Sequence, residues 1–150
     1  MNSTVIEREV LDHFQKISPS EWASLFELLP IIEQYSNLED NPVSLGRQPD
    51  VRNPKEWSKF DIERVTEMRF YELGLVTSLP MEYAREVNNL REQGVPYDRF
   101  STFQLVKAIT LIARANHHSN RISFDFEKGD IAELVRALKS RVNLIFDIGK

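Results

Sequence analysis

Two adjacent histidines, His117 and His118, are the residues of this chain best suited to chemistry. An imidazole can ligate a metal ion or exchange a proton near neutral pH. Neighbouring side chains on a regular helix point about 100° apart, so both histidines could bind one metal ion only at a frayed helix end. Asp125 and Glu127 lie close enough in sequence to join such a site. An enzyme or metal-dependent protein is therefore one alternative hypothesis, although ordinary polarity at a helix end explains the same residues.

A thin line of polar residues leads to these histidines through an otherwise apolar segment. The line consists of Gln104, Lys107, Arg114 and His118. Spacings of three, seven and four residues place its members on one side of a helix. A helix that is apolar nearly all round packs on most sides, so we expect the line to reach either solvent or a buried partner. The candidate partner-binding residues are Lys107, Arg114, His117, His118 and Arg121.

Other common chemistries lack their residues. The five glycines are widely separated, and none stands in a GxGxxG or P-loop spacing that would cradle phosphates. The chain has no cysteine, no GxSxG nucleophile elbow and no HExxH zinc pattern. Because these motifs are absent, the sequence predicts no cofactor and no metal, and it favours a protein without catalytic activity.

The polar line requires a helix to carry it, and the sequence predicts one at about 102–117. Ser101 and Gln104 have the spacing of a capping box, in which both side chains satisfy free backbone amides. A second helix is expected near the C-terminus, where apolar residues recur at helical spacing after Gly129 and Asp130. Those residues are Ile131, Leu134, Val135, Leu138 and Val142. Between the two helices, residues 121–126 alternate polar and apolar, which favours a strand; a short helix ending at Gly129 is the alternative.

The N-terminal two-thirds read as further helices around a long irregular segment. Ser18, Pro19 and Glu21 form a strong helix start, and Pro30 predicts a kink or break before residue 31. Residues 36–56 are rich in proline and polar residues, so they predict a loop that could bind a partner, with Trp57 anchoring its end. Further helices are expected at 61–73, ending at Gly74, and from about 78 to Gly94.

These elements predict a mainly α fold in one domain spanning residues 1–150. We expect a compact bundle of five to seven helices around the central apolar helix at about 102–117. At most a small two-stranded β element accompanies it, formed if the apolar tail at 144–148 pairs with residues 121–126. That tail could instead cap the core or form an interface, so the oligomeric state stays open.

Charge and the N-terminus limit the classes of partner. The chain has a net charge of −4 over its 150 residues. Residues 1–100 hold 11 lysines and arginines against 18 acidic residues, a net charge of −7. Residues 101–150 hold 8 against 5, a net charge of +3. An acidic chain is a poor binder of nucleic acid, although the C-terminal third keeps a nucleic-acid-binding regulator as a further alternative. The N-terminus has charged residues where a signal peptide would be apolar, so we expect a cytoplasmic protein without a membrane anchor.

Several segments resemble a family of small uncharacterised bacterial and phage proteins, known as a domain of unknown function. The residues Tyr71-Glu-Leu-Gly-Leu75 are similar to that family's turn after a helix, and 105–114 is similar to its apolar helix ending in arginine. Gly129 and the helix after it, and the segment from Trp22 to Pro30, also resemble the family. The chain departs from the pattern at His117-His118, where the family has Arg-Phe. The resemblance implies a small helical domain and no particular activity.

Taken together, the sequence predicts a non-enzymatic module that binds another protein. An immunity protein, an antitoxin-like protein or a phage counter-defence inhibitor would each be of this type. The prediction follows from the absence of catalytic motifs, the small size, the acidic charge and the long loop.

Overall fold

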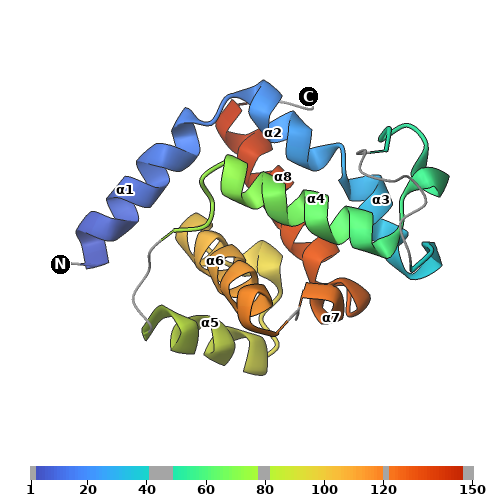
Figure 1. The fold of residues 1–150 in the computed structure, drawn as a ribbon. Helices are drawn as coiled ribbons and strands as arrows, with labels where there is room; N and C mark the ends of the chain where they lie inside the picture. The colour runs from blue at the N-terminus through green and yellow to red at the C-terminus, as the bar shows by residue number, and fades with distance from the viewer. Residues whose placement is uncertain (1–2, 41–48, 78–81, 120–121, 147–150) are drawn as a thin grey trace.

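The computed structural model describes residues 3–40, 49–77, 82–119 and 122–146 (Figure 1). Its α-helices are α1 (Ser3–Lys16), α2 (Pro19–Phe26), α3 (Leu29–Glu33), α4 (Lys59–Glu72), α5 (Glu82–Glu92), α6 (Thr102–Ser119), α7 (Ile122–Glu127) and α8 (Asp130–Phe146). All but the five-residue α3 have six residues or more. The described residues include no strand, only an isolated bridge between Glu39 and Ser58. The predicted mainly α bundle is confirmed.

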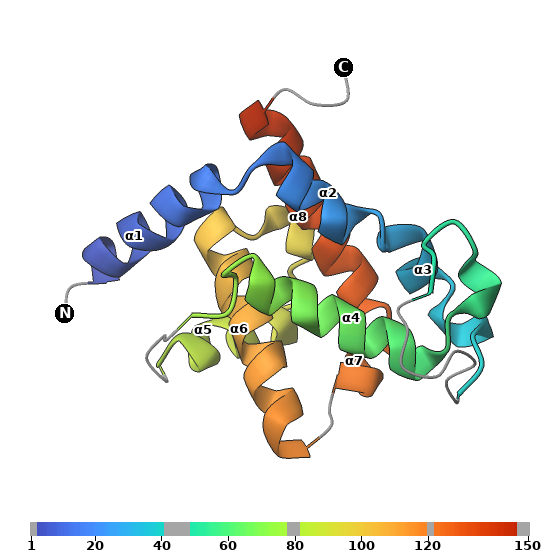
Figure 2. The same cartoon turned by 45° about the horizontal axis from the view of Figure 1, so that its top comes forward.

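Helix α6 is the centre of the bundle, as predicted. It contacts α1, α5, α7 and α8, and Figures 1 and 2 show these helices arranged around it. Its residues Leu105, Ala108 and Ile109 are fully buried. Helix α8 buries every apolar position predicted for its inward face. Both helices therefore supply one contiguous apolar cluster, which also receives side chains from α1, α2 and α4.

Capping residues fix where the helices begin. Ser18 caps α2 in a reciprocal box with Glu21, and Ser101 pairs in the same way with Gln104 at the start of α6, as predicted. Helix α4 begins at Lys59, two residues earlier than predicted, because Ser58 and Asp61 form a third capping box that is almost fully buried. The helix is interrupted between Phe26 and Leu29. Pro30 lies in the first turn of α3, where its missing amide costs least.

The strand predicted at 121–126 is wrong, because residues 122–127 form α7. Ile122 and Phe126 stand one helical turn apart and are both buried, and the ring of Phe126 stacks on Tyr35 with centroids 5.0 Å apart. Alternation at 122, 124 and 126 therefore coincides with an i, i+4 pair that faces the core. The predicted pairing with the tail is also wrong over the described residues, since α8 continues to Phe146. Residues 147 and 148 lie outside the part described.

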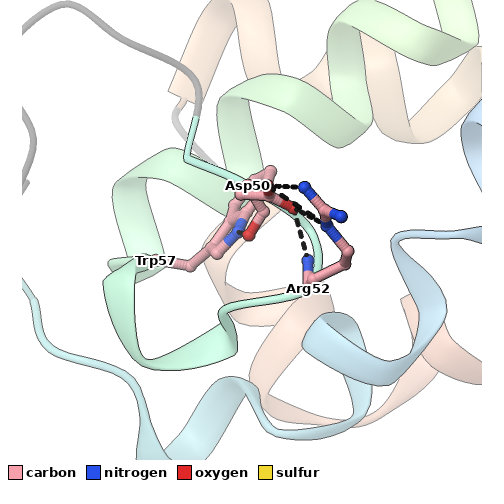
Figure 3. A network of polar contacts seen from close by, with 3 residues as sticks. All are labelled: Asp50, Arg52 and Trp57. Atoms are coloured by element: carbon pink, nitrogen blue, oxygen red, sulfur yellow. Dashed lines mark hydrogen bonds and ion pairs between the residues drawn. The ribbon is translucent and has the colours of Figure 1, made fainter.

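Two short 3-10 helices lie at the two ends of the irregular segment at 36–56, namely η1 (Tyr35–Asn37) and η2 (Pro54–Glu56). Trp57 is fully buried, which confirms its predicted role as an anchor, and its Nε1 donates to the carbonyl of Asp50 at 3.0 Å (Figure 3). The guanidinium of Arg52 pairs with the Asp50 carboxylate at 2.8 Å and lowers its pKa to about 2. Residues 41–48 of the predicted partner-binding loop lie outside the described residues.

Candidate functional site

The predicted polar line of α6 lies against α5. Lys107 is only 4% exposed, and its Nζ lies 2.5 Å from Oε2 of Glu86 on α5. Gln104 donates from Nε2 to the other oxygen of the same carboxylate at 3.0 Å. Lys107 also stands 4.1 Å from the centroid of the Phe103 ring. This part of the line therefore meets a partner on a neighbouring helix, and the side chain of that partner, Glu86, is 39% exposed.

The next part of the line holds the segment that follows Gly74. Arg114 donates from Nη2 to the carbonyl of Thr77 at 2.8 Å. One turn earlier, Thr110 donates its hydroxyl to the carbonyl of Leu75 and accepts from the amide of Thr77, both at 3.2 Å. Lys107 and Arg114 thus link α6 to neighbouring elements, and their assignment to partner binding stays a prediction.

The remaining sequence candidates are described less fully. His117 and His118 lie on α6, but their side chains are outside the described part, as is the whole of Arg121. Among the described side chains, no group of three or more histidine, aspartate and glutamate residues is placed to hold a metal ion. The hypothesis of a metal or acid–base site at the histidines stays a prediction.

A different surface combines unusual composition with exposure. We call it the α4 face, and it consists of Phe60, Arg64, Met68 and Tyr71 on the outer side of α4. Phe60 is 51% exposed, Met68 41% and Tyr71 42%, and the guanidinium of Arg64 contacts the sulfur of Met68. Spacings of four, four and three residues make the α4 face one continuous stripe. Helix α4 lies at the front of the molecule in both Figure 1 and Figure 2.

The opposite side of α4 is a normal core face. Ile62, Val65 and Phe70 are fully buried, and Arg69 ties α4 to α2 by donating to the carbonyl of Ser24 at 3.3 Å. Apolar side chains therefore point from α4 in both directions. The inward set supplies the packing that holds the helix, so the α4 face is not required for that packing.

Carboxylates gather at the N-terminal end of α4. Nζ of Lys59 lies 3.4 Å from Asp40 and 3.8 Å from Glu127, and both carboxylates are largely exposed. Tyr35 donates its hydroxyl to the carboxylate of Glu63. Burial raises the pKa of Glu63, with a further contribution from Glu127, against the opposing effects of Tyr35 and Lys59. Around Lys59, three carboxylates thus face one cation, and the local charge beside Phe60 is negative.

Two arginines of α8 contact other parts of the protein. Arg136 pairs with Glu33 at 3.1 Å, and Arg141 donates to the backbone carbonyls of Asp98 and Phe100 at 3.1 and 2.5 Å. These contacts hold α3 and the short helix η3 (Tyr97–Arg99) against α8. These two arginines of α8 therefore contribute to packing.

Sequence reasoning missed Phe60 and Met68, and it used Tyr71 only in the family resemblance. The apolar residues on the inner side of this helix are Ile62, Val65, Phe70 and Leu73, and all are buried. The available signal was the remaining apolar residues, because they recur on the opposite side of the same helix. A helix with apolar residues on both sides indicates a second contact surface.

No protein-family model, curated protein or solved structure matches this chain. The resemblance to the uncharacterised bacterial and phage family therefore stays a prediction. Within the described ranges, no helix combines the length and apolar character needed to span a membrane.

Proposed function

We propose that this protein binds another protein through the α4 face. The observation that carries the proposal is the stripe of Phe60, Met68 and Tyr71, each more than 40% exposed on a helix whose other side is fully packed. Aromatic residues, methionine and arginine are the types enriched in the cores of protein interfaces. All four residues of the α4 face belong to these types.

The stripe suits the helix-in-groove mode of recognition. Anchors that recur every three or four residues insert side by side into an apolar groove on a partner. Full burial of one large apolar side chain is worth about 1.5–3 kcal/mol. Each anchor is already about half buried in the protein, so covering the exposed remainder of all three would contribute about 2–4 kcal/mol.

Charge around the stripe specifies the partner further. Asp40 and Glu127 are exposed beside the N-terminal end of α4, and Glu63 lies one turn from Phe60. Opposite charges across an interface speed association and reject wrong partners. The expected partner surface is therefore an apolar groove with lysine or arginine along the rim that meets this end of α4. Such a module would act as an immunity protein, an antitoxin-like protein or a phage counter-defence inhibitor.

Selection from a displayed library of random peptides tests the proposal without knowledge of the natural partner. The protein serves as bait, and enriched peptides are measured against a variant carrying Phe60→Ser, Met68→Ser and Tyr71→Ser. A variant carrying Val5→Ser and Leu144→Ser is the matched control, since both residues are exposed and apolar but lie on α1 and α8. We expect enriched peptides that combine apolar residues with lysine and arginine. These peptides should bind the control variant and should not bind the variant with the substituted α4 face.

Two outcomes would overturn the proposal. Enriched peptides that bind the α4 variant as tightly as the unchanged protein would place recognition elsewhere. A dimer of the unchanged protein that dissociates on substitution of the α4 face would assign the stripe to self-association. Light scattering of both variants distinguishes the second outcome.

A further inference from the structure

Met68 lies between Arg64 and Tyr71 on the α4 face and carries a thioether at the protein surface. The residue is 41% exposed and stands about one helical turn from each of these neighbours. The guanidinium of Arg64 donates to its sulfur at 3.5 Å, and both side chains of this contact lie on the outer side of α4. The sulfur is therefore held at the surface, where small solutes can reach it, and is not packed beneath the helix.

The thioether of Met68 can be oxidised by a peroxide. The chain has no cysteine, so methionine sulfur is its group most readily oxidised in this way. The sulfur attacks one oxygen of a hydroperoxide, and the S–O bond forms as the O–O bond breaks. The leaving oxygen takes the proton of the transferred hydroxyl group and departs as water or as an alcohol. The sulfur is oxidised by two electrons, the peroxide is reduced by two, and the product is methionine sulfoxide.

Oxidation would change the side chain where the α4 face offers an apolar anchor. A thioether sulfur is a weak acceptor of hydrogen bonds, whereas a sulfoxide is polar and chiral. Arg64 already directs a donor at this sulfur, so the new oxygen has a cation close by. Burying the sulfoxide in an apolar groove would remove water from its oxygen, which is unfavourable. Met68 lies outside the packed side of α4, so the same oxidation leaves the core intact.

We propose that Met68 is a redox switch, which a hydroperoxide converts to the sulfoxide and which thereby weakens partner binding by the α4 face. The inference rests on the proposed function of that face and adds a means of regulating it. A partner seated on the α4 face covers the sulfur, so the peroxide acts on the free protein. Methionine sulfoxide reductases reverse the oxidation, so the binding surface can be restored.

The rate of oxidation tests whether the sulfur is open to solutes, and this measurement needs no partner. Hydrogen peroxide is added to the protein, and the sulfoxide at Met68 is followed by mass spectrometry of proteolytic peptides. Because susceptibility follows exposure, we expect a rate within about fivefold of that of N-acetylmethionine amide. A slower rate would show that the sulfur is shielded and would overturn the switch.

The affinity of a selected peptide, measured before and after oxidation, tests the switch itself. The peptide contains no methionine, and the peroxide is removed before the titration. We expect oxidation of the unchanged protein to weaken binding about tenfold and a reductase to restore it. Met68→Leu is the matched control, because its apolar side chain resists peroxide and the other two methionines remain. Whatever affinity this variant has for the peptide, peroxide should not change it.

The outcomes separate the switch from the proposed function. Unchanged affinity after oxidation would overturn the switch and leave the α4 face as the binding surface. Equal losses in the unchanged protein and in Met68→Leu would assign the effect to another residue and would also overturn it. A lower urea midpoint after oxidation would assign the loss of binding to unfolding. Peptides that bind the variant with the substituted α4 face as tightly as the unchanged protein would overturn both proposals.

Discussion

The polar line of α6 and the α4 face contrast a charged region that is buried with an apolar region that is exposed. Lys107 is 4% exposed although it is a cation, and Phe60 is 51% exposed although it is a large hydrophobe. Lys107 and Arg114 of the line have partners inside the chain, in Glu86 and the backbone of Thr77. Phe60 and Met68 of the α4 face are large hydrophobes that the described residues leave more than 40% exposed.

The contrast shows that residue type indicates function only in relation to its surroundings. Charges attract attention as candidate binding residues, yet a buried and paired charge is chiefly a constraint on folding. A single exposed hydrophobe is ordinary, whereas a stripe on a helix that is already packed indicates an unmet contact. We therefore expect substitutions in the line to reduce stability and substitutions in the α4 face to reduce binding.

The largest loss of stability is expected for Lys107→Met. The change keeps the apolar stem of the side chain but leaves Glu86 without the ammonium group. Removing one member of a buried ion pair costs about 3–5 kcal/mol, and we expect the lower end because Glu86 is partly exposed. Urea denaturation measures the change. Adding Glu86→Leu should restore much of the loss, and a Lys107→Met variant as stable as the parent would show that the line is not structural.

The next largest loss of stability is expected for Gly74→Ala. This residue lies where α4 joins the segment that Thr110 and Arg114 hold. Gly74 has a φ of 71°, a left-handed conformation that costs alanine about 1–2 kcal/mol. A Cβ atom there would also overlap the ring of His13, whose Nε2 donates to the carbonyl of Leu73 at 2.8 Å. Thermal unfolding of Gly74→Ala and of the double variant with His13→Ala separates the two causes. Equal losses in both variants would exclude the ring contact.

The pH dependence of stability should have opposite signs in the two regions. Burial tends to raise the pKa of Glu86, but hydrogen bonds from Lys107 and Gln104 outweigh it and leave the pKa below the ordinary value of 4.5. Its stabilising effect is therefore present above that value and is lost as the pH falls through the lowered pKa.

Glu63 beside the α4 face has its pKa raised by burial, so folding becomes less favourable as the pH rises from 4.5 through the raised value. Urea midpoints from about pH 3 to about pH 7 test both glutamates. Relative to the parent, Glu86→Gln should lose stability as the pH rises, and Glu63→Gln should gain it. Parallel trends for the two variants would contradict this assignment.

The smallest effect on stability is expected on the α4 face. Phe60→Ser with Tyr71→Ser should change the free energy of unfolding by about 0.5 kcal/mol or less, as for other exposed sites. Urea denaturation beside Lys107→Met makes the comparison direct. A loss as large as that of Lys107→Met would assign these residues to folding.

Local patterns predicted the helices with clear signals. Capping residues located the starts of α2 and α6, and helical periodicity identified the core side of α8, because both depend on neighbours in sequence. The strand predicted at 121–126 was wrong because the short alternation fits a strand and a helix equally. The stacking of Phe126 on Tyr35 favours the helix. That contact joins residues far apart in sequence.

The candidate sites were predictable only in part for the same reason. Periodicity found the polar line, but the partner that covers it, Glu86, comes from another helix. Gly74 predicted where α4 ends, while the exposure of Phe60 depends on which helices pack beside it.

The most direct test of the account is the affinity of a selected peptide for variants matched in stability. The peptide obtained with the unchanged protein is titrated against Phe60→Ser with Tyr71→Ser, and against Val5→Ser with Leu144→Ser. The account predicts a loss of about 100-fold for the first pair and no change for the second, since each interface anchor contributes more than about 1 kcal/mol. Unchanged affinity for the first pair, at unchanged stability, would contradict the assignment of the α4 face to protein binding.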